Sequence, residues 1–399
     1  MSQDRTMLTT LWSETDGVLL LRSVATAMVR LSEVGDPGAY TLPYPDEAQR
    51  ALNTTVLTCL LLKAKPPESL PELVEWAAKR PLDQWPGTLP PDVVPPESRF
   101  LDEATRQPTA LCYEWAVDAE DSAARHSEQR YMAIASQRCW EENYPEAYRA
   151  FRLLLTRRPV LTHRELATLP AAADGELGPL GDLLYDVYRP APSGHLDRER
   201  RSHISCARCH TLLHLTVGGD LWCERRRCRE LGTARRGREY PVDDGGGAQL
   251  LIRPLRQWVS ATGALEERLA QRLAAAGADV ELWPGFGAYG IRVRFPGGTT
   301  LAVDHKDWES PALLGRRAVP PQPDPPYDRC VWVVPAARLR KNPDFRTTFE
   351  AYRPSASPEL MTDRELLRTA RRLIGTTAPG LRDTAPDPGP DGEATEGLF

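Results

Sequence analysis

Apolar residues recur at helical spacing through much of the first 200 residues. Residues 11–35 predict an amphipathic helix with four of them close to one face, at Leu20, Val24, Met28 and Leu31. Residues 46–63 predict a second helix, with apolar positions at Leu52, Val56, Leu60 and Leu61. Residues 109–156 predict two more, the second carrying Tyr144, Tyr148, Phe151 and Leu155. The pattern therefore predicts that residues 1–200 form a mostly helical scaffold or partner-docking region.

Capping signals show where several helices begin. Ser69 and Thr162 are each followed three residues later by a glutamate, the arrangement of a capping box. We therefore expect helices at 70–79 and 163–169. A third box precedes residues 363–374 and predicts a helix near the C-terminal end.

The pattern changes beyond the glycine-rich stretch at 243–247, which is expected to be a hinge. Residues 264–276 predict an amphipathic helix that ends at Gly277, because glycine commonly occupies the position after a helix. Short apolar or alternating segments then predict strands at 279–282, 289–295, 301–308 and 330–335. The turn Pro296-Gly297-Gly298 joins two of them as a hairpin. This order predicts an α/β core over residues 248–352.

One of these strands, residues 301–308, carries an acid and a lysine two residues apart. Side chains alternate between the faces of a strand, so Asp304 and Lys306 project together while His305 points the other way. A carboxylate can hold a divalent metal, and a lysine beside it can steady a phosphate or orient water. The alternative is an ordinary exposed ion pair. His305 is expected to be packed rather than catalytic.

The composition is that of a soluble globular protein with room for two or three domains: 41% of the 399 residues are hydrophobic and 26% are charged. No apolar run approaches the roughly 20 residues that span a membrane. Residues 1–5 lack the basic and then apolar organisation of a secretory signal, so we expect the cytoplasm. The net charge of −5 means that any nucleic-acid surface must be a local patch.

Four of the eight cysteines are clustered, at Cys206, Cys209, Cys223 and Cys228. Two cysteine pairs separated by a predicted hairpin are what a tetrahedral zinc ribbon requires. Because four thiolates fill the coordination sphere, we expect the zinc to fold residues 201–232 rather than to catalyse. The alternative, unliganded thiols, would leave this segment with almost no core. The other cysteines, isolated in apolar or helical surroundings, are expected to be small buried residues.

Arginines crowd the end of this predicted ribbon, at Arg225, Arg226, Arg227, Arg229, Arg235, Arg236 and Arg238. A basic patch beside a zinc ribbon often contacts phosphates, which makes the first six candidate nucleic-acid-binding residues. The alternative is an arginine-rich face that only keeps the segment soluble.

Residues 250–350 resemble the restriction-endonuclease-like superfamily of PD-(D/E)XK nucleases. The stretch 301–308 looks like the (D/E)XK strand, and Leu265-Glu266, followed by Leu269, Leu273 and Gly277, looks like the first helix. The resemblance implies that Asp304 binds Mg²⁺, that Lys306 orients the water and steadies the scissile phosphate, and that Glu266 is an accessory metal ligand.

The wider layout is similar to that of endonuclease-like proteins encoded beside prokaryotic PIWI–RE proteins and a helicase. The features that carry this resemblance are the helical N-terminal region, Tyr148-Arg149-Ala150-Phe151-Arg152, Arg158-Pro159-Val160-Leu161-Thr162, the ribbon and the nuclease-like domain. It implies a DNA endonuclease in a defence system against invading DNA, with a PIWI–RE protein and a helicase as partners.

The chain departs from the superfamily at one position. The other metal-binding aspartate aligns with Gly290, which has no side chain. Either Asp279 or Glu281 supplies the carboxylate, or the domain is a degenerate DNA-binding or assembly adaptor. If position 290 is a vacant ligand site, Gly290→Asp should raise cleavage. A zinc-ribbon transcription regulator is a further alternative, but no major-groove reading helix is recognisable.

The predicted fold class is therefore a multidomain α+β chain. It combines a helical N-terminal region (1–200), a four-cysteine zinc ribbon (201–232) and a restriction-endonuclease-like α/β domain (248–352). A C-terminal helix follows in residues 353–377. Residues 378–399 are rich in proline, glycine and acids and are expected to be a disordered tail.

Overall fold

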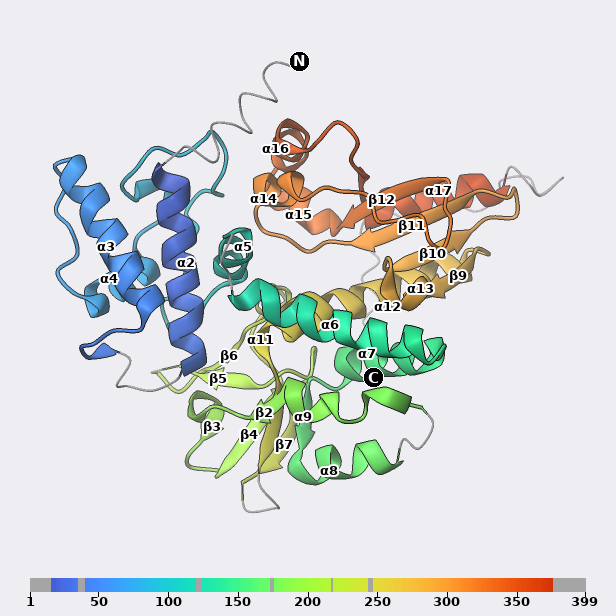
Figure 1. Ribbon diagram of the computed structural model, residues 1–399, viewed down its shortest axis with the longest axis horizontal. Helices are drawn as coiled ribbons and strands as arrows, with labels where there is room; N and C mark the ends of the chain where they lie inside the picture. The colour runs from blue at the N-terminus through green and yellow to red at the C-terminus, as the bar shows by residue number, and fades with distance from the viewer. Residues whose placement is uncertain are drawn as a thin grey trace.

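The computed structural model of the 399-residue chain is shown in Figure 1. It describes residues 16–34, 40–119, 123–172, 176–216, 218–242 and 247–375. The tail expected at 378–399 lies outside the described residues, as does the expected hinge except for Gly247. None of the helices in the described residues is long and apolar enough to cross a membrane.

The N-terminal helices pack as the apolar spacing predicted. The helices here are α2 (Asp16–Val34), α3 (Asp46–Leu61), α4 (Leu70–Lys79) and α5 (Ala110–Asp118). The four apolar residues predicted on one face of the first helix are all buried, between α3 and α5. Ser69 caps α4 by accepting a hydrogen bond from the Glu72 amide, so the first predicted capping box is confirmed at this end.

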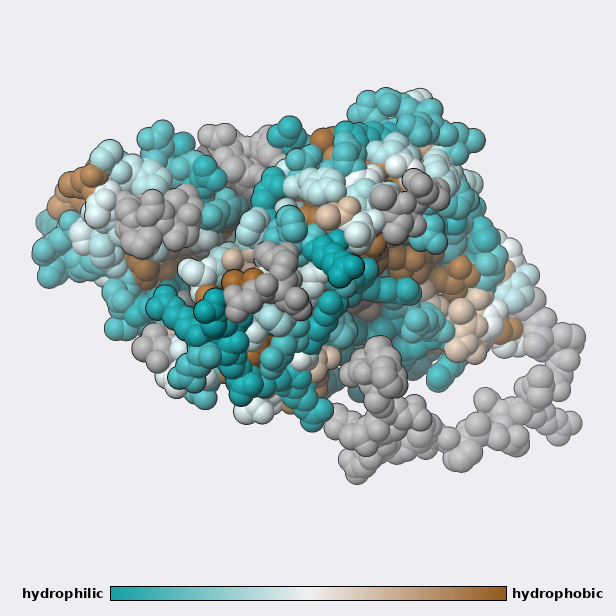
Figure 2. Space-filling view, turned by 90° about the horizontal axis from the view of Figure 1, so that it is seen from below, coloured by the Kyte–Doolittle hydropathy of each residue, from teal (hydrophilic) through white to brown (hydrophobic). Residues whose placement is uncertain are grey.

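The predicted apolar face of α3 is wrong in part. Leu52 is buried, but Leu60 and Leu61 are 61% and 71% exposed. The face that packs against α2 is instead a stripe of mostly small residues at helical spacing, namely Ala48, Ala51, Leu52, Thr55 and Cys59. Small side chains let two helices approach closely, and α3 therefore turns its larger leucines outward. Figure 2 shows hydrophobic residues on the surface at the end of the molecule where α3 lies.

Three helices, not two, occupy residues 109–156, because α5 is followed by α6 (Ala123–Glu141) and α7 (Pro145–Arg157). The capping box at Thr162 is confirmed by two hydrogen bonds: the Glu165 amide donates to Thr162 Oγ1, and the Thr162 amide donates to the Glu165 carboxylate. The box begins α8 (His163–Ala172). A short helix, α9 (Leu183–Val187), follows. The region also contributes to a small sheet in the order β1 (Val160–Thr162), β8 (Ala248–Leu251), β2 (Tyr188–Pro190).

The cysteine-rich segment contains the predicted hairpin. Strands β5 (Leu213–Leu215) and β6 (Leu221–Cys223) pair antiparallel and are followed by α10 (Arg226–Glu230). Beside them a three-stranded sheet has the order β3 (Leu196–Asp197), β4 (Ser202–Cys206), β7 (Arg236–Pro241). These strands leave little core of their own beyond the cysteines and a few apolar residues.

The C-terminal part is built on a five-stranded sheet in the order β13-β12-β11-β10-β9. Its strands are β9 (Asp279–Leu282), β10 (Ile291–Arg294), β11 (Thr300–His305), β12 (Arg329–Val334) and β13 (Glu359–Thr362). The first three pair antiparallel, and β12 and β13 run parallel to β11. The predicted hairpin is confirmed, whereas β13 was not predicted.

Helices cover both faces of this sheet (Figure 1). Leucines of α12 (Ala261–Ala275) and α17 (Asp363–Gly375) pack on one face, on Ile291, Val303 and Val333. The other face presents Trp332 and Leu360 to α14 (Pro311–Arg316), α16 (Phe345–Tyr352) and the N-terminal helices in one continuous core. Short helices α11 (Arg253–Leu255), α13 (Pro284–Gly287) and α15 (Ala336–Lys341) complete the part. The helix predicted at 363–374 is confirmed and belongs to this layered unit.

Candidate functional site

Asp304 and Lys306 lie together at the end of β11, as the alternation predicted. The Lys306 Nζ is 3.5 Å from Oδ2 of Asp304 and 4.8 Å from the ring centre of Trp332, the residue opposite Asp304 on β12. The other carboxylate oxygen, Oδ1, accepts a hydrogen bond of 2.8 Å from the backbone N–H of Gly290. Both side chains are half-buried, so solvent and a ligand can reach them.

Glu266 enters the same site from α12 and is buried. Its Oε2 accepts a hydrogen bond of 2.7 Å from Nε1 of Trp283 and lies 3.5 Å from Nη2 of Arg152. Burial raises the pKa of the Glu266 carboxyl above its usual value, and the charge of Arg152 acts most strongly against this rise. The negative charge of Asp304 also raises that pKa, which places the two carboxylates within each other's electrostatic reach.

Gly290 is where the two carboxylates meet. A Cβ on Gly290 would overlap Oε1 of Glu266, and it would lie 2.9 Å from Cδ of Glu266 and 3.0 Å from the carbonyl oxygen of Val303. The carboxyl group of Glu266 thus fills the space that a side chain at position 290 would need. The structure brings Glu266, Asp304 and Lys306 together around this glycine.

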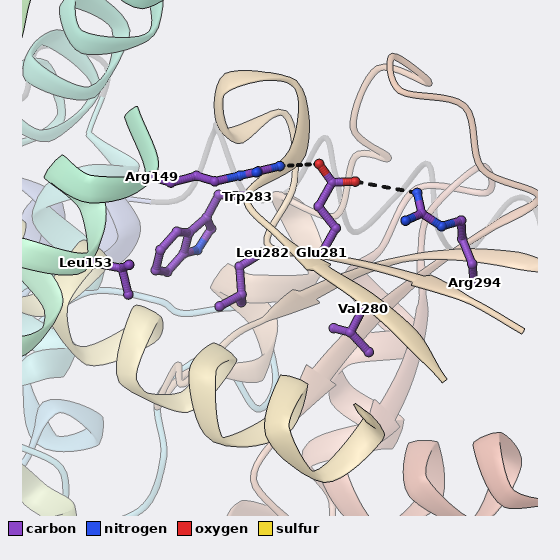
Figure 3. Close-up of a pocket in the computed structure, with 7 residues that line it drawn as sticks. All are labelled: Arg149, Leu153, Val280, Glu281, Leu282, Trp283 and Arg294. Atoms are coloured by element: carbon purple, nitrogen blue, oxygen red, sulfur yellow. Dashed lines mark hydrogen bonds and ion pairs between the residues drawn. The ribbon is translucent and has the colours of Figure 1, made fainter. Parts of the chain in front are cut away.

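The two acids suggested as substitutes are engaged elsewhere. Asp279 is exposed and pairs with Arg294 at 2.7 Å. Glu281 is held by Arg149, and its Oε2 lies 3.6 Å from Arg294 and 3.9 Å from Arg292. Figure 3 shows Glu281 between Arg149 and Arg294, beside a hollow of about 520 Å³ between α7 and the edge strand β9. The carboxylates of Asp279 and Glu281 thus face arginines rather than Asp304.

His305 is buried on the opposite side of the strand from Asp304. Burial lowers its pKa to about 4, so its ring is uncharged at neutral pH. Its neighbour Asp307 pairs with Arg338 at 2.8 Å, and that charge holds the pKa of Asp307 below its ordinary value against the effect of burial. Neither residue joins the group around Gly290, in keeping with the prediction that His305 is a packed residue.

Two family models match the chain: pPIWI_RE three-gene island domain Y over residues 20–162, and REase associating with pPIWI_RE over residues 263–377. The chain is a restriction-endonuclease-like protein of the pPIWI_RE island. No curated protein and no solved structure matches it. We refer to the two matched segments as domain Y and the REase domain. Glu266, Asp304 and Lys306 all lie in the REase domain, and the cysteine-rich segment lies between the two.

Domain Y contributes side chains that sequence reasoning missed, because no chemistry was expected before residue 200. Arg149 and Arg152 both reach the REase domain from α7, to Glu281 and Glu266 respectively. Arg157, one turn further on, pairs with Glu267. The sequence does show arginines along the helix now seen as α7 and acids on the later helix α12. Nothing in the sequence indicated that the two would meet.

The four clustered cysteines are brought together as predicted. Their Sγ atoms all lie within 4.8 Å of one another, and those of Cys209 and Cys223 are 3.5 Å apart. Among the residues that the structure describes, this is the one group of three or more metal-binding side chains. The ring of His214 packs on His195, with the ring centres 3.7 Å apart, rather than joining the sulfurs.

The cysteine-rich segment is fixed to the rest of the island protein by buried polar contacts. Trp222 Nε1 donates to Asp102 in domain Y at 3.0 Å. Glu224, beside the last sulfur pair, is buried between Arg253 and Arg256, at 3.1 and 2.8 Å. These arginines hold the pKa of Glu224 well below its ordinary value despite its burial. The segment is therefore a fixed part of the molecule.

The six candidate phosphate-binding arginines fall into two groups. Three of them make local contacts. Arg225 donates to Ser260 Oγ, and Arg226 pairs with Glu230 and Glu309. Arg229 donates to the carbonyl of Cys223 and stacks on the ring of Trp222. Arg227, Arg235 and Arg236 are exposed, and Arg236 makes a long 4.0 Å pair with Asp197. The exposed three face solvent, while the other three hold the segment in place.

Proposed function

We propose that this protein is a metal-dependent DNA endonuclease that works with a PIWI–RE protein and a helicase in defence against invading DNA. The observation that supports it is the meeting of the Glu266 and Asp304 carboxylates at Gly290, with Lys306 beside Asp304, inside a domain matched as a REase. Carboxylates that can hold a divalent metal, with a lysine beside them, are groups suited to metal-assisted phosphodiester hydrolysis.

The two carboxylates fit a Mg²⁺ ion. Magnesium prefers hard oxygen ligands and is often held by one or two carboxylates while it keeps several waters. Glu266 has one oxygen bound to Trp283 and Arg152, and the other directed at Gly290, where Asp304 is anchored. When bound, the ion would stabilise charge on the phosphate and lower the pKa of a water.

Lys306 has a separate role in this proposal. Its ammonium group is half-buried, fixed by Asp304 and by the face of Trp332, and it lies on the same side of the strand as the carboxylate. From there it can donate a hydrogen bond to an oxygen of the scissile phosphate and orient the attacking water. A compact ammonium group suits this task because it has three donors and no fixed plane.

The four cysteines are proposed to hold a structural zinc. Four sulfurs each about 2.3 Å from a central ion lie a little under 4 Å from one another, close to the spacing found here. The closed set leaves no position for substrate, so the metal would stabilise the fold of residues 201–232. The exposed arginines that follow would contact the phosphates of bound DNA.

The nuclease proposal is tested by cleavage of duplex and single-stranded DNA with Mg²⁺ or Mn²⁺, using the full chain alone and with its island partners. We expect metal-dependent cleavage that is lost in Asp304→Ala and in Lys306→Ala. Asp279→Ala is the matched control, because Asp279 is an exposed acid of the same sheet that pairs with Arg294 at the surface. If the wild-type protein and its complexes never cleave with either metal, the proposal fails.

DNA contact by the arginines is tested separately from cleavage. Replacing Arg227, Arg235 and Arg236 with alanine should weaken DNA binding at every sequence and flatten its dependence on salt. Arg238→Ala is the control, because Arg238 already pairs with Glu165 at 2.9 Å. Equal affinities for the triple variant and the control would remove these arginines from the interface.

A second candidate is a catalytically inactive adaptor whose REase domain binds DNA. The observation that favours it is that two carboxylates, rather than three, meet around Gly290 among the residues the structure describes. The adaptor predicts DNA affinity that falls steeply with salt and is unchanged in Asp304→Ala. Metal-dependent turnover would exclude it.

A further inference from the structure

We propose that Arg152, on α7 of domain Y, is a positioning residue of the nuclease site that orients the Glu266 carboxylate for metal binding. This inference rests on the proposed function, since it assigns Glu266 to the metal. It makes domain Y a part of the nuclease site rather than only a docking module.

Arg152 and Trp283 hold the same oxygen of Glu266. Trp283 Nε1 donates to Oε2 at 2.7 Å, and Nη2 of Arg152 lies 3.5 Å from that atom. The guanidinium group also lies over the indole ring, 5.1 Å from its centre. Because both donors bind Oε2, the Oε1 atom faces Gly290, whose backbone N–H donates to the Asp304 carboxylate. The two donors would therefore leave Oε1 as the oxygen of Glu266 that could bind a metal at Gly290.

The contact between Arg152 and Glu266 is largely buried. The side chain of Glu266 is 3% exposed and that of Arg152 is 14% exposed, so water cannot easily take over either contact. Partners that fix a metal ligand from behind set the ligand's orientation, and their loss typically weakens metal binding by about 10–100-fold. We expect an effect of this size if Arg152 has this role.

The position of Arg152 depends on close packing of α7 against the REase domain. Tyr148, one turn earlier, fills the space where a side chain on Gly287 would lie, and its Oη is 3.4 Å from Nη1 of Arg152. One turn later, Thr156 fills the space at Gly263 of α12. Ser260 Oγ also donates to the Thr156 carbonyl at 3.3 Å. Two glycines thus let α7 approach closely enough for Arg152 to reach Glu266.

Another arginine of α7 provides a matched comparison. Arg157 pairs with Glu267, the residue next to Glu266, but it is 61% exposed, and within the part of the chain that the structure describes no hydrogen bond or ion pair joins this pair to Gly290. Removing it therefore deletes an ion pair between the same two helices without touching the carboxylate of Glu266. A general loosening of α7 would affect both variants alike.

The test is a calorimetric titration of the zinc-loaded full chain with Mn²⁺, together with a melting curve for each variant. We expect Glu266→Gln and Arg152→Met each to weaken Mn²⁺ binding by about tenfold or more, and Arg157→Met to change it less than about twofold. Arg152→Lys should be intermediate, because lysine keeps the charge but lacks the planar fork. Trp283→Phe removes the other donor to Oε2 and should weaken binding too.

The outcomes separate this inference from the proposed function. If Glu266→Gln leaves Mn²⁺ binding unchanged, Glu266 is not a metal ligand and the role of Arg152 falls with that assignment, whereas the nuclease proposal itself falls only if the wild type never cleaves DNA. If Glu266→Gln weakens binding while Arg152→Met behaves like Arg157→Met, the nuclease site stands and the role of Arg152 is overturned. Should Arg152→Met fail to fold, wild-type Mn²⁺ affinity in both Arg152→Lys and Trp283→Phe would overturn it equally.

Discussion

The carboxyl group of Glu266 occupies the space beside Gly290 that any larger residue there would need. A glycine at this position therefore has a structural reason, which is to admit a carboxylate that comes from helix α12 instead of from the strand. From the sequence, Gly290 indicated a missing ligand. The structure shows that the expected accessory acid of α12 fills this space, so the carboxylates of Glu266 and Asp304 are the two that meet at Gly290.

Restoring an acid at position 290 should harm the site instead of raising cleavage. In Gly290→Asp the new side chain must displace the buried Glu266 or push on the Val303 carbonyl, 3.0 Å from the Cβ position. Overpacking of this kind typically costs about 1–3 kcal/mol. We expect a lower melting temperature and weaker cleavage in both Gly290→Ala and Gly290→Asp. Faster cleavage by Gly290→Asp would show that position 290 is a vacant ligand site after all.

Zinc should be present and should matter for stability. We expect about one zinc per chain by elemental analysis, and Cys209→Ser should lose it and unfold at lower temperature, because the ribbon has almost no core apart from the sulfurs. Cys59→Ser is the control, since Cys59 is buried in α3, far along the chain from the cluster. A zinc content far below one would refute the metal site.

Acid should destabilise the protein through its buried histidines. Burial lowers the pKa of His214 from the ordinary 6.5 to about 4. In the unfolded chain the His214 ring is protonated below about pH 6.5, whereas in the folded protein it stays neutral down to about pH 4. The free energy of unfolding therefore falls as the pH is lowered from about 6.5 to about 4. The slope is about 1.4 kcal/mol per pH unit for one such group.

The check is unfolding by urea between about pH 7 and pH 5, compared for the wild type and His214→Gln. The variant lacks this titrating ring, so its stability should fall less steeply over the same window. His163→Gln is a control, because His163 is an exposed residue at the start of α8. Parallel slopes for wild type and His214→Gln would contradict the assignment.

The leucines at the end of α3 should be dispensable for stability. Leu61→Gln removes a side chain that is 71% exposed, so the free energy of unfolding should change by less than about 0.5 kcal/mol. Leu20→Ala, in the fully buried stripe of α2, should cost about 2–5 kcal/mol. Urea denaturation measures both. A large loss in Leu61→Gln would mean that the predicted apolar face of α3 was right.

Local signals were enough to predict much of the fold. Helix spacing, the capping box at Thr162, the stop at Gly277 and the alternation around Asp304 each depend on residues close in sequence, and each is confirmed. The cysteine spacing likewise predicted the cluster that the structure shows. Such patterns can be predicted because the residues that cause each structure lie close together in the sequence.

Contacts between distant segments could not be predicted in this way. Arg152 and Glu266 are 114 positions apart, and they meet only because Gly263 and Gly287 admit α7. The exposed side of α3 depends in the same way on how closely α2 approaches. Strand β13 is four residues long and is recognisable only from its pairing with β12. The domain boundaries, which several of these contacts cross, stay predictions.

The central claim is that Glu266 and Asp304 together supply the carboxylates of one nuclease site. It is tested most directly by metal-dependent nicking of plasmid DNA by the partner-loaded protein, comparing Glu266→Gln with Glu281→Gln. Glu281 is an acid of the same domain that is held by arginines at the edge strand. We predict that Glu266→Gln abolishes nicking as Asp304→Ala does, while Glu281→Gln retains it. Full activity in Glu266→Gln, or its loss in Glu281→Gln, would contradict the claim.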